Sequence, residues 1–230
     1  LFDTGPVNAS VSPLLRAIKA AIPNGADLDL IIAHTHNHSD HSAGDGIFEG
    51  CQPAFRSVTR VGHSVPELED FFPGLRFPDG SPISFNLGER DLQLFPIPGH
   101  CETHLAIFDE HTNCLVTGDL LYPGRLYVND DPLDFAASAQ RLADFVEGLP
   151  SHQDLRVLGC HIELMSNQQG QSWEYPIGTV YQPDEVPYAL GAEDVQRLAR
   201  ITAGAQFREL HQEEDGADGA AGCFKLRGDA

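Results

Sequence analysis

Residues 35–44 read Thr-His-Asn-His-Ser-Asp-His-Ser-Ala-Gly and place four metal-ligand side chains within six positions, namely His36, His38, Asp40 and His41. The preceding residues, 28–33, form a short apolar run that predicts a buried strand. A loop at a strand end can fold back, so that two histidines face one ion while the aspartate and the third histidine face a second. The stretch therefore predicts a metal-binding connection after a strand. A chance cluster of solvated histidines is the alternative.

Three further stretches end in a histidine or an aspartate after a turn or an apolar run. They are Pro98-Gly99-His100, Thr117-Gly118-Asp119 and Gly159-Cys160-His161. Together with the first stretch, they resemble in the same order the ligand motifs of the metallo-β-lactamase fold superfamily, over roughly residues 1–165. The resemblance implies an αββα sandwich of two mixed β-sheets with helices on the outer faces.

The resemblance also implies a centre of two divalent metal ions. The implied ligands form two sets of three and one bridging aspartate: His36, His38 and His100; Asp40, His41 and His161; and Asp119. A water or hydroxide would be the second bridge. Zinc is the expected metal, with iron and manganese as alternatives, because imidazole suits zinc and iron and such sites leave a position open for water. Two metals about 3.5–4 Å apart lower the pKa of that water, so no serine or cysteine nucleophile is required.

Asp3, His104 and Tyr122 are expected to support this centre. Asp3 would accept the far N–H of a ligand histidine, or else cap a turn before Gly5. His104 follows His100 by four residues, as in the glyoxalase II-like branch. Tyr122 stands three residues after Asp119, where lactonases of this superfamily place a tyrosine that would donate to the developing oxyanion. The alternative for Tyr122 is a pocket wall. Asp40 and Tyr122 are the predicted catalytic side chains.

The function expected from the resemblance is a dinuclear zinc hydrolase of the glyoxalase II-like or lactonase-like branch. A metal-bridging hydroxide would attack an ester, thioester or lactone of a small molecule. An aspartate at position 119 argues against antibiotic hydrolysis, and scattered arginines after His161 argue against a true glyoxalase II. The alternatives are a mononuclear iron persulfide dioxygenase that uses His36, His100 and Asp119, a phosphodiesterase acting on a small nucleotide-like substrate, and a non-catalytic metal-binding or partner-binding domain.

Composition limits the partners. The formal net charge of −20, from 14 basic and 34 acidic residues, disfavours binding of a nucleic acid polymer. No apolar run approaches 18 residues, so a membrane span is not expected, and a cytoplasmic location is favoured. The five cysteines are an odd number without a C-x-x-C pair, which argues against a disulfide framework. Cys101 and Cys160 each adjoin a proposed ligand and are expected to pack behind the site. The sequence makes no prediction of oligomeric state.

Residues 1–230 are expected to form one domain, with an acidic low-complexity loop or tail at about 211–222. The chain opens on Leu1-Phe-Asp-Thr-Gly, and we expect it to be a fragment or a processed form that lacks the first strands of one sheet, so the sequence makes no prediction about a targeting segment. Helices are predicted at 12–22, 64–72, 135–149 and 192–203, and strands at 28–33, 54–60, 83–87, 92–97, 105–108, 114–117, 155–158 and 207–210. His34 is interpreted as a strand-end histidine and His63 as a loop residue without a role.

Overall fold

The structure, a computed structural model, describes residues 1–6, 13–22, 25–48, 54–167, 169, 171–204, 207 and 222–225. Its helices are α1 (Pro13–Ala21), α2 (Ser39–Ser42), α3 (Val65–Phe71), α4 (Pro132–Glu147) and α5 (Ala192–Thr202). Six strands form the main sheet: β3 (Ile83–Asn86), β4 (Asp91–Pro96), β5 (Leu105–Asp109), β6 (Cys114–Gly118), β8 (Arg156–Gly159) and β11 (Ala189–Leu190). Three smaller pairs join β1 (Asp29–Ile32) to β2 (Ser57–Arg60), β7 (Arg125–Val128) to β12 (Gly222–Lys225), and β9 (Leu164–Ser166) to β10 (Ser172–Glu174).

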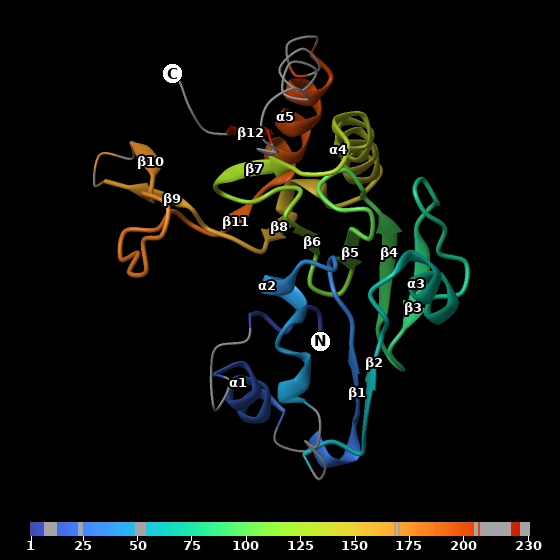
Figure 1. Ribbon diagram of the computed structural model, residues 1–230. Coiled ribbons are helices and arrows are strands. Elements are labelled where there is room, and N and C mark those ends of the chain that lie inside the picture. Colours follow the sequence, from blue (N-terminus) through green and yellow to red (C-terminus); the bar gives the residue numbers. More distant parts are fainter. Residues whose placement is uncertain are drawn as a thin grey trace.

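The main sheet is mixed and has the strand order β11-β8-β6-β5-β4-β3. Its neighbours pair antiparallel except β6 and β8, which run parallel, with Leu115 opposite Val157. The small β1–β2 pair is also parallel, and Phe2 bridges to Ala33 beside it. Because β1, β6 and β8 all end toward one edge, the residues that follow them gather around α2 (Figure 1).

Side chains of β1 and β4 alternate between different cores, and this alternation defines the layers. Leu30 and Ile32 of β1 pack toward α1, whereas Ala33 packs with Leu94 of β4 between the two sheets. Phe95, the next residue of β4, packs on the opposite face of the main sheet with α4 and α5. The order of layers is therefore α1, β1–β2, main sheet, and α4 with α5 (Figure 1). The αββα sandwich predicted from the sequence is confirmed.

The start of α4 is held against the loop that carries His100. The side chain of Asp131 accepts hydrogen bonds from the N–H groups of Leu133 and Asp134, and Pro132 fills the first helical position. The carbonyl of Gly99 accepts from the N–H groups of residues 130 and 131. Gly99 has a φ of 120°, and a Cβ there would lie 2.2 Å from the backbone nitrogen of Phe135. A glycine before His100 is therefore needed for α4 to pack this closely.

Most predicted elements are present with shifts of a few residues at their ends. The strands β7, β9, β10, β11 and β12 were not predicted, because they are short and lack a clear alternation of apolar residues. Of the predicted strand 207–210, only Phe207 is described, and its backbone is helical. The predicted acidic segment at about 211–222 lies outside the described residues except for Gly222, which belongs to β12.

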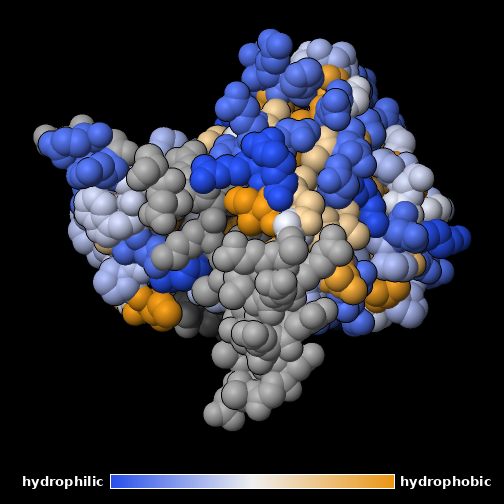
Figure 2. Space-filling view, turned by 90° about the horizontal axis from the view of Figure 1, so that it is seen from above, coloured by the Kyte–Doolittle hydropathy of each residue, from blue (hydrophilic) through white to orange (hydrophobic). Residues whose placement is uncertain are grey.

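Hydrophilic side chains cover most of the described surface on the face seen in Figure 2, and apolar side chains appear there in separate small areas. This distribution agrees with the excess of acidic over basic residues. Within the described part of the chain, no helix has the length and apolar character required to cross a bilayer.

Candidate metal centre

The first cluster consists of three histidines from two loops. His36 and His38 follow β1, and His100 follows β4. Nδ1 of His38 lies 2.9 Å from Nε2 of His36 and 3.1 Å from Nε2 of His100. Three ring nitrogens thus face a common point, as the ligands of one tetrahedral metal ion do.

In two of the rings, a hydrogen bond at Nδ1 determines that Nε2 presents its lone pair to that point. Nδ1 of His100 lies 2.8 Å from the carbonyl oxygen of Tyr127, so it must carry the proton and donate. The Thr35 hydroxyl donates to Asp3 at 2.9 Å and can therefore accept from Nδ1 of His36 at 3.1 Å. In the neutral rings, Nε2 of His36 and of His100 is then unprotonated and suited to bind a metal.

The second cluster combines two carboxylates with two histidines. Asp40 and His41 lie on α2, Asp119 follows β6 and His161 follows β8. Nε2 of His41 and Nε2 of His161 lie 3.6 Å and 3.5 Å from Oδ2 of Asp40. His41 is buried, whereas the side chain of Asp40 is 50% exposed, so this cluster is open to solvent on one side.

Asp119 lies between the two clusters. Its Oδ2 is 3.2 Å from Nε2 of His161 and 3.4 Å from Nε2 of His41 in one cluster. The same oxygen is 3.5 Å from Nε2 of His100 and 3.9 Å from Nε2 of His36 in the other. Its second oxygen, Oδ1, is buried and has no hydrogen-bond partner among the described residues. One carboxylate is thus within reach of an ion in either cluster.

The negative charge of the carboxylates in the second cluster is balanced by protons on two histidines. Burial lowers the pKa of His36 and His100, so both are neutral at pH 7. Burial also opposes protonation of His41, but its contacts with Asp119 and Asp3 outweigh this and raise its pKa to about 12. The pKa of His161 is raised in the same way, chiefly by Asp119 against the effect of burial. Protons on these two rings compensate the carboxylates, a role that a divalent cation would fill, and the donor set fits zinc.

Asp3 contacts two residues of the first motif. Its Oδ1 accepts from the Thr35 N–H at 2.8 Å, and its Oδ2 accepts from the Thr35 hydroxyl at 2.9 Å. Oδ2 also lies 3.1 Å from Nδ1 of His41, which donates to it and so directs Nε2 toward Asp119. The sequence predicted a contact of Asp3 with a proposed ligand histidine, and the structure shows it at His41. Asp3 has a left-handed backbone with a φ of 59°, a conformation that aspartate and asparagine adopt more readily than most residues.

His104 is fully buried and contacts the backbone of the central carboxylate. Its Nε2 accepts a hydrogen bond from the N–H of Asp119 at 3.3 Å. Burial lowers the pKa of His104 well below its usual value, which keeps the ring neutral and able to accept. Gly118, with a φ of 53°, allows this approach, because a Cβ there would lie 2.3 Å from the same nitrogen.

Tyr122 is buried beside the second cluster, with its ring centroid 5.3 Å from that of His161. Its hydroxyl donates its one proton to the carbonyl oxygen of Arg125, so that this proton is not available to a substrate. The guanidinium of Arg125 pairs with Glu163 at 3.2 Å and with Glu174 at 3.5 Å. This geometry favours the wall over the oxyanion donor for Tyr122, and its catalytic role stays a prediction.

The two cysteines beside proposed ligands contact polar groups of the site. Sγ of Cys101 lies 3.0 Å from Oδ1 of Asn37, and Sγ of Cys160 lies 3.3 Å from Oδ2 of Asp3. Asp3, His41 and Cys160 themselves form a group with ligand atoms within 4.8 Å of one another. Burial raises the pKa of the Cys160 thiol to about 11, so it remains protonated at neutral pH.

Two contacts of the site were not predicted from the sequence. The Thr35 hydroxyl orients His36, and a threonine before the first histidine gave a signal that could have been used. The carbonyl of Tyr127 orients His100, but a backbone oxygen leaves no mark in the sequence.

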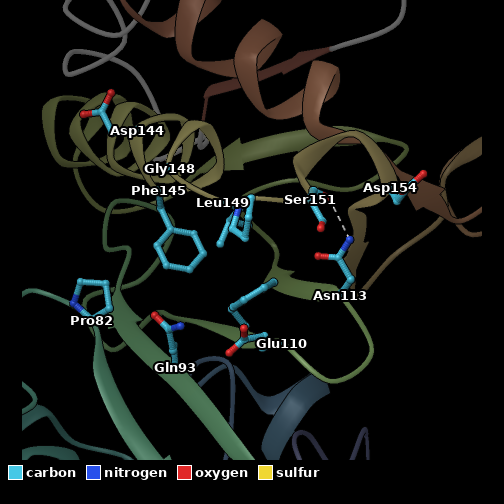
Figure 3. A pocket seen from close by; sticks show the side chains of 12 residues that line it. Pro82, Gln93, Glu110, Asn113, Asp144, Phe145, Gly148, Leu149, Ser151 and Asp154 are labelled. Carbon is cyan, nitrogen blue, oxygen red and sulfur yellow. Dashed lines mark hydrogen bonds between the residues drawn. The ribbon is translucent and has the colours of Figure 1, made fainter.

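A hollow of about 830 Å³ elsewhere is bordered by the end of α4 and by Phe108, Glu110 and Asn113 (Figure 3). None of the proposed ligands lines it.

Comparison with known proteins finds similarity to one superfamily. The model of the metallo-beta-lactamase superfamily matches residues 52–161, which include His100, Asp119 and His161. The acyl-coenzyme A thioesterase MBLAC2 of Bos taurus is 28% identical over 165 residues, covering 59% of this chain and 58% of that protein. The lactamase-like protein adaB of Aspergillus niger is 28% identical over 155 residues, covering 66% of this chain and 45% of that protein. The chain thus spans about half the length of these curated relatives.

Solved structures share the fold at low sequence identity. ETHE1 from Myxococcus xanthus superimposes with a TM-score of 0.53 and 17% identity, over 94% of this chain and 80% of that one. A metallo-beta-lactamase from Hirschia baltica superimposes with a TM-score of 0.54 and 18% identity, over 88% of this chain and 80% of that one. The ordered motifs, the αββα layers and these matches agree: the chain has the metallo-β-lactamase fold, and its residues 52–161 match the model of that superfamily.

Proposed function

We propose that this protein is a hydrolase that cleaves an ester, thioester or lactone of a small molecule with the help of two divalent metal ions, zinc being the expected metal. The position of Asp119 Oδ2, between 3.2 Å and 3.9 Å from four ring nitrogens of both clusters, carries the proposal. A bridging carboxylate of this kind is what a two-metal centre requires. The superfamily contains hydrolases, and the similarity to a thioesterase supports the class of reaction.

In this proposal, His36, His38 and His100 would hold one ion, and Asp40, His41 and His161 the other, with Asp119 shared. When bound, the metals would lower the pKa of a water molecule and polarise the substrate carbonyl. The protein's part is orientation: the Tyr127 carbonyl and Thr35 fix the rings of His100 and His36, and Asp3 fixes that of His41. Asp40, half exposed on the open side of its cluster, would bind the second ion and is the carboxylate that we expect to take part in catalysis.

The negative charge of the protein limits the kind of substrate that we expect. The chain carries a formal net charge of −20, and Arg125, near Tyr122, is paired with two glutamates. We therefore expect substrates with few negative charges to have a higher kcat/KM than polyanionic ones such as acyl-coenzyme A. The test compares a neutral thioester with its coenzyme A counterpart at low and high salt. A coenzyme A ester that is preferred at every salt concentration would overturn the charge argument.

The second candidate is an iron-dependent persulfide dioxygenase. The observation that favours it is the face formed by His36, His100 and Asp119, which is the two-histidine, one-carboxylate set typical of mononuclear iron sites. The experiment that separates the candidates is an activity panel on metal-loaded protein. Hydrolysis of thioesters, lactones or esters that disappears in Asp119→Ala supports the first. Oxygen uptake with a persulfide would favour the dioxygenase over the hydrolase of esters and thioesters. Release of phosphate monoesters alone would favour the phosphodiesterase.

A further inference from the structure

We propose that His34, Asp45 and His63 form an additional binding site for one zinc-class divalent ion, separate from the two clusters around Asp119. The three residues come from different segments. His34 follows β1, Asp45 begins the short helical turn Asp45–Ile47 after α2, and His63 lies between β2 and α3. They form a group with ligand atoms within 4.8 Å of one another.

The geometry suits a small ion. Nε2 of His34 lies 2.9 Å from Oδ1 of Asp45, and Nε2 of His63 lies 3.1 Å from Oδ2. Ligand atoms of a tetrahedral zinc site with bonds of about 2.0–2.1 Å are separated by about 3.3 Å, so small shifts would open space for the ion. The two imidazole rings meet edge to face, with centroids 4.5 Å apart and planes at 71°. Each ring can therefore direct a nitrogen at the carboxylate without stacking on the other.

The surroundings supply another oxygen and a route to solvent. The Thr4 hydroxyl lies 2.9 Å from Oδ1 of Asp45. His34 and Asp45 are buried, whereas the side chain of His63 is 33% exposed, so an ion can enter past His63. Nη1 of Arg60 is 3.8 Å from Oδ2 of Asp45, and because the Arg60 side chain is 56% exposed, it can turn into solvent when an ion binds. Two imidazoles, one carboxylate and an open position form a donor set that zinc accepts.

An ion at this position would have a structural role. It would join the N-terminal segment at Thr4, the turn at Asp45 and the loop before α3, and so add to the hydrogen bonds that these segments already make to the Asp45 carboxylate. His34 also lies two residues before His36, so the ion would hold the end of β1 from which the first proposed ligand extends. The inference does not depend on the proposed hydrolase activity.

The alternative is a carboxylate that only accepts hydrogen bonds, and the variant His63→Gln distinguishes the two. Glutamine keeps a donor toward Asp45 but is a poor zinc ligand. The full-length variant, the wild type and a control, His111→Gln at an exposed turn, are dialysed against zinc buffered at about 1 μM. Elemental mass spectrometry then gives the zinc content per chain. We expect His63→Gln to hold one zinc fewer than the wild type and His111→Gln to match it.

Two further readouts keep the test sharp. In EDTA, the melting temperatures of wild type and His63→Gln should agree. In zinc, the melting temperature of the wild type should rise more than that of His63→Gln. Asp45→Asn, which keeps the size of the side chain, should lose the same ion. Hydrolysis by His63→Gln should stay within about twofold of wild type, because His63 contacts none of the proposed catalytic ligands. Equal zinc content in wild type and His63→Gln would overturn the inference, whatever the protein hydrolyses.

Discussion

The carboxylate of Asp3 accepts a hydrogen bond from Nδ1 of His41 over 3.1 Å, although 38 positions separate the two residues. The same oxygen accepts the hydroxyl of Thr35, whose own oxygen lies 3.1 Å from Nδ1 of His36. One carboxylate near the start of the chain thus orients rings in both clusters. Because the proton of His41 is held on Nδ1, its Nε2 is available to a metal ion.

We predict that Asp3→Asn weakens zinc binding by about 10–100-fold while the fold is kept. Asparagine tolerates the left-handed backbone at position 3, so the loss would come from the missing charge and not from strain. Competition with a zinc chelator measures the affinity. Asp27→Asn, which removes an exposed acid before β1, at the end of the strand opposite to His36, is the control for charge alone. An affinity equal to that of the control would contradict the orienting role.

Replacement of Tyr122 by phenylalanine should change kcat by less than about threefold, because the hydroxyl proton is donated to the Arg125 carbonyl and is not available to a substrate. The lost hydrogen bond leaves that carbonyl without its partner, which should reduce the free energy of unfolding by about 1 kcal/mol. Steady-state kinetics and urea unfolding of the same preparation measure both quantities. A fall in kcat of about 100-fold with unchanged stability would instead assign Tyr122 as the oxyanion donor.

His104 should make the metal-free protein sensitive to acid. Its pKa is lowered in the folded state, whereas in the unfolded state it is near 6.5. Below that pH the unfolded chain binds a proton that the folded chain does not, so the stabilisation present above pH 6.5 is lost as the pH falls. The loss is at most about 1.4 kcal/mol per pH unit. His41 and His161, whose folded pKa values are raised, act in the opposite direction near pH 6.5, and their contribution cancels when a His104 variant is compared with the wild type.

The test uses His104→Gln, since a glutamine oxygen can still accept from the Asp119 N–H. Unfolding by urea at several pH values between 5 and 7, in EDTA, should show a shallower loss of stability in the variant. If the free energy of unfolding had the same pH dependence in both proteins, His104 would take up its proton in the folded state as readily as in the unfolded state.

Gly118→Ala should destabilise the protein by about 3 kcal/mol or more. The new Cβ would lie 2.3 Å from Nε2 of His104, and the positive φ of 53° adds strain. Gly178→Ala is the matched control, because Gly178 also has a positive φ, 84°, but has no atom within 4 Å of a built Cβ. We expect the control to lose only about 1 kcal/mol. Similar losses in both variants would mean that His104 moves aside at little cost.

The sequence predicted the αββα fold and the residues that gather at the clusters because both are encoded locally. Each proposed ligand follows a strand or turn with a clear apolar or Pro-Gly signature, as at His100 and Asp119. Ligand motifs in this order specify which strand ends must meet, even though the sequence says nothing about distances. The contact of Asp3 with a ligand histidine was predicted for the same reason, since it begins at a recognisable Asp-Thr-Gly segment.

Contacts that depend on three-dimensional packing were not predictable. His34 and His63 are 29 positions apart and were assigned to a strand end and a loop, yet both reach Asp45. The short strands β9 and β10 carry too few residues to show a period. For Tyr122, the spacing from Asp119 suggested a catalytic hydroxyl, but the direction of that hydroxyl depends on the Arg125 carbonyl, which no sequence pattern records.

The most direct test of the two-metal hydrolase is the metal content of protein purified without added metal, measured by elemental mass spectrometry. The His63→Gln variant is the right sample, because only the clusters joined by Asp119 then contribute. We predict close to two zinc ions per chain. We also predict that Asp119→Ala loses these ions and, with them, thioester or lactone hydrolysis. One iron per chain and no zinc would contradict the account and favour the dioxygenase.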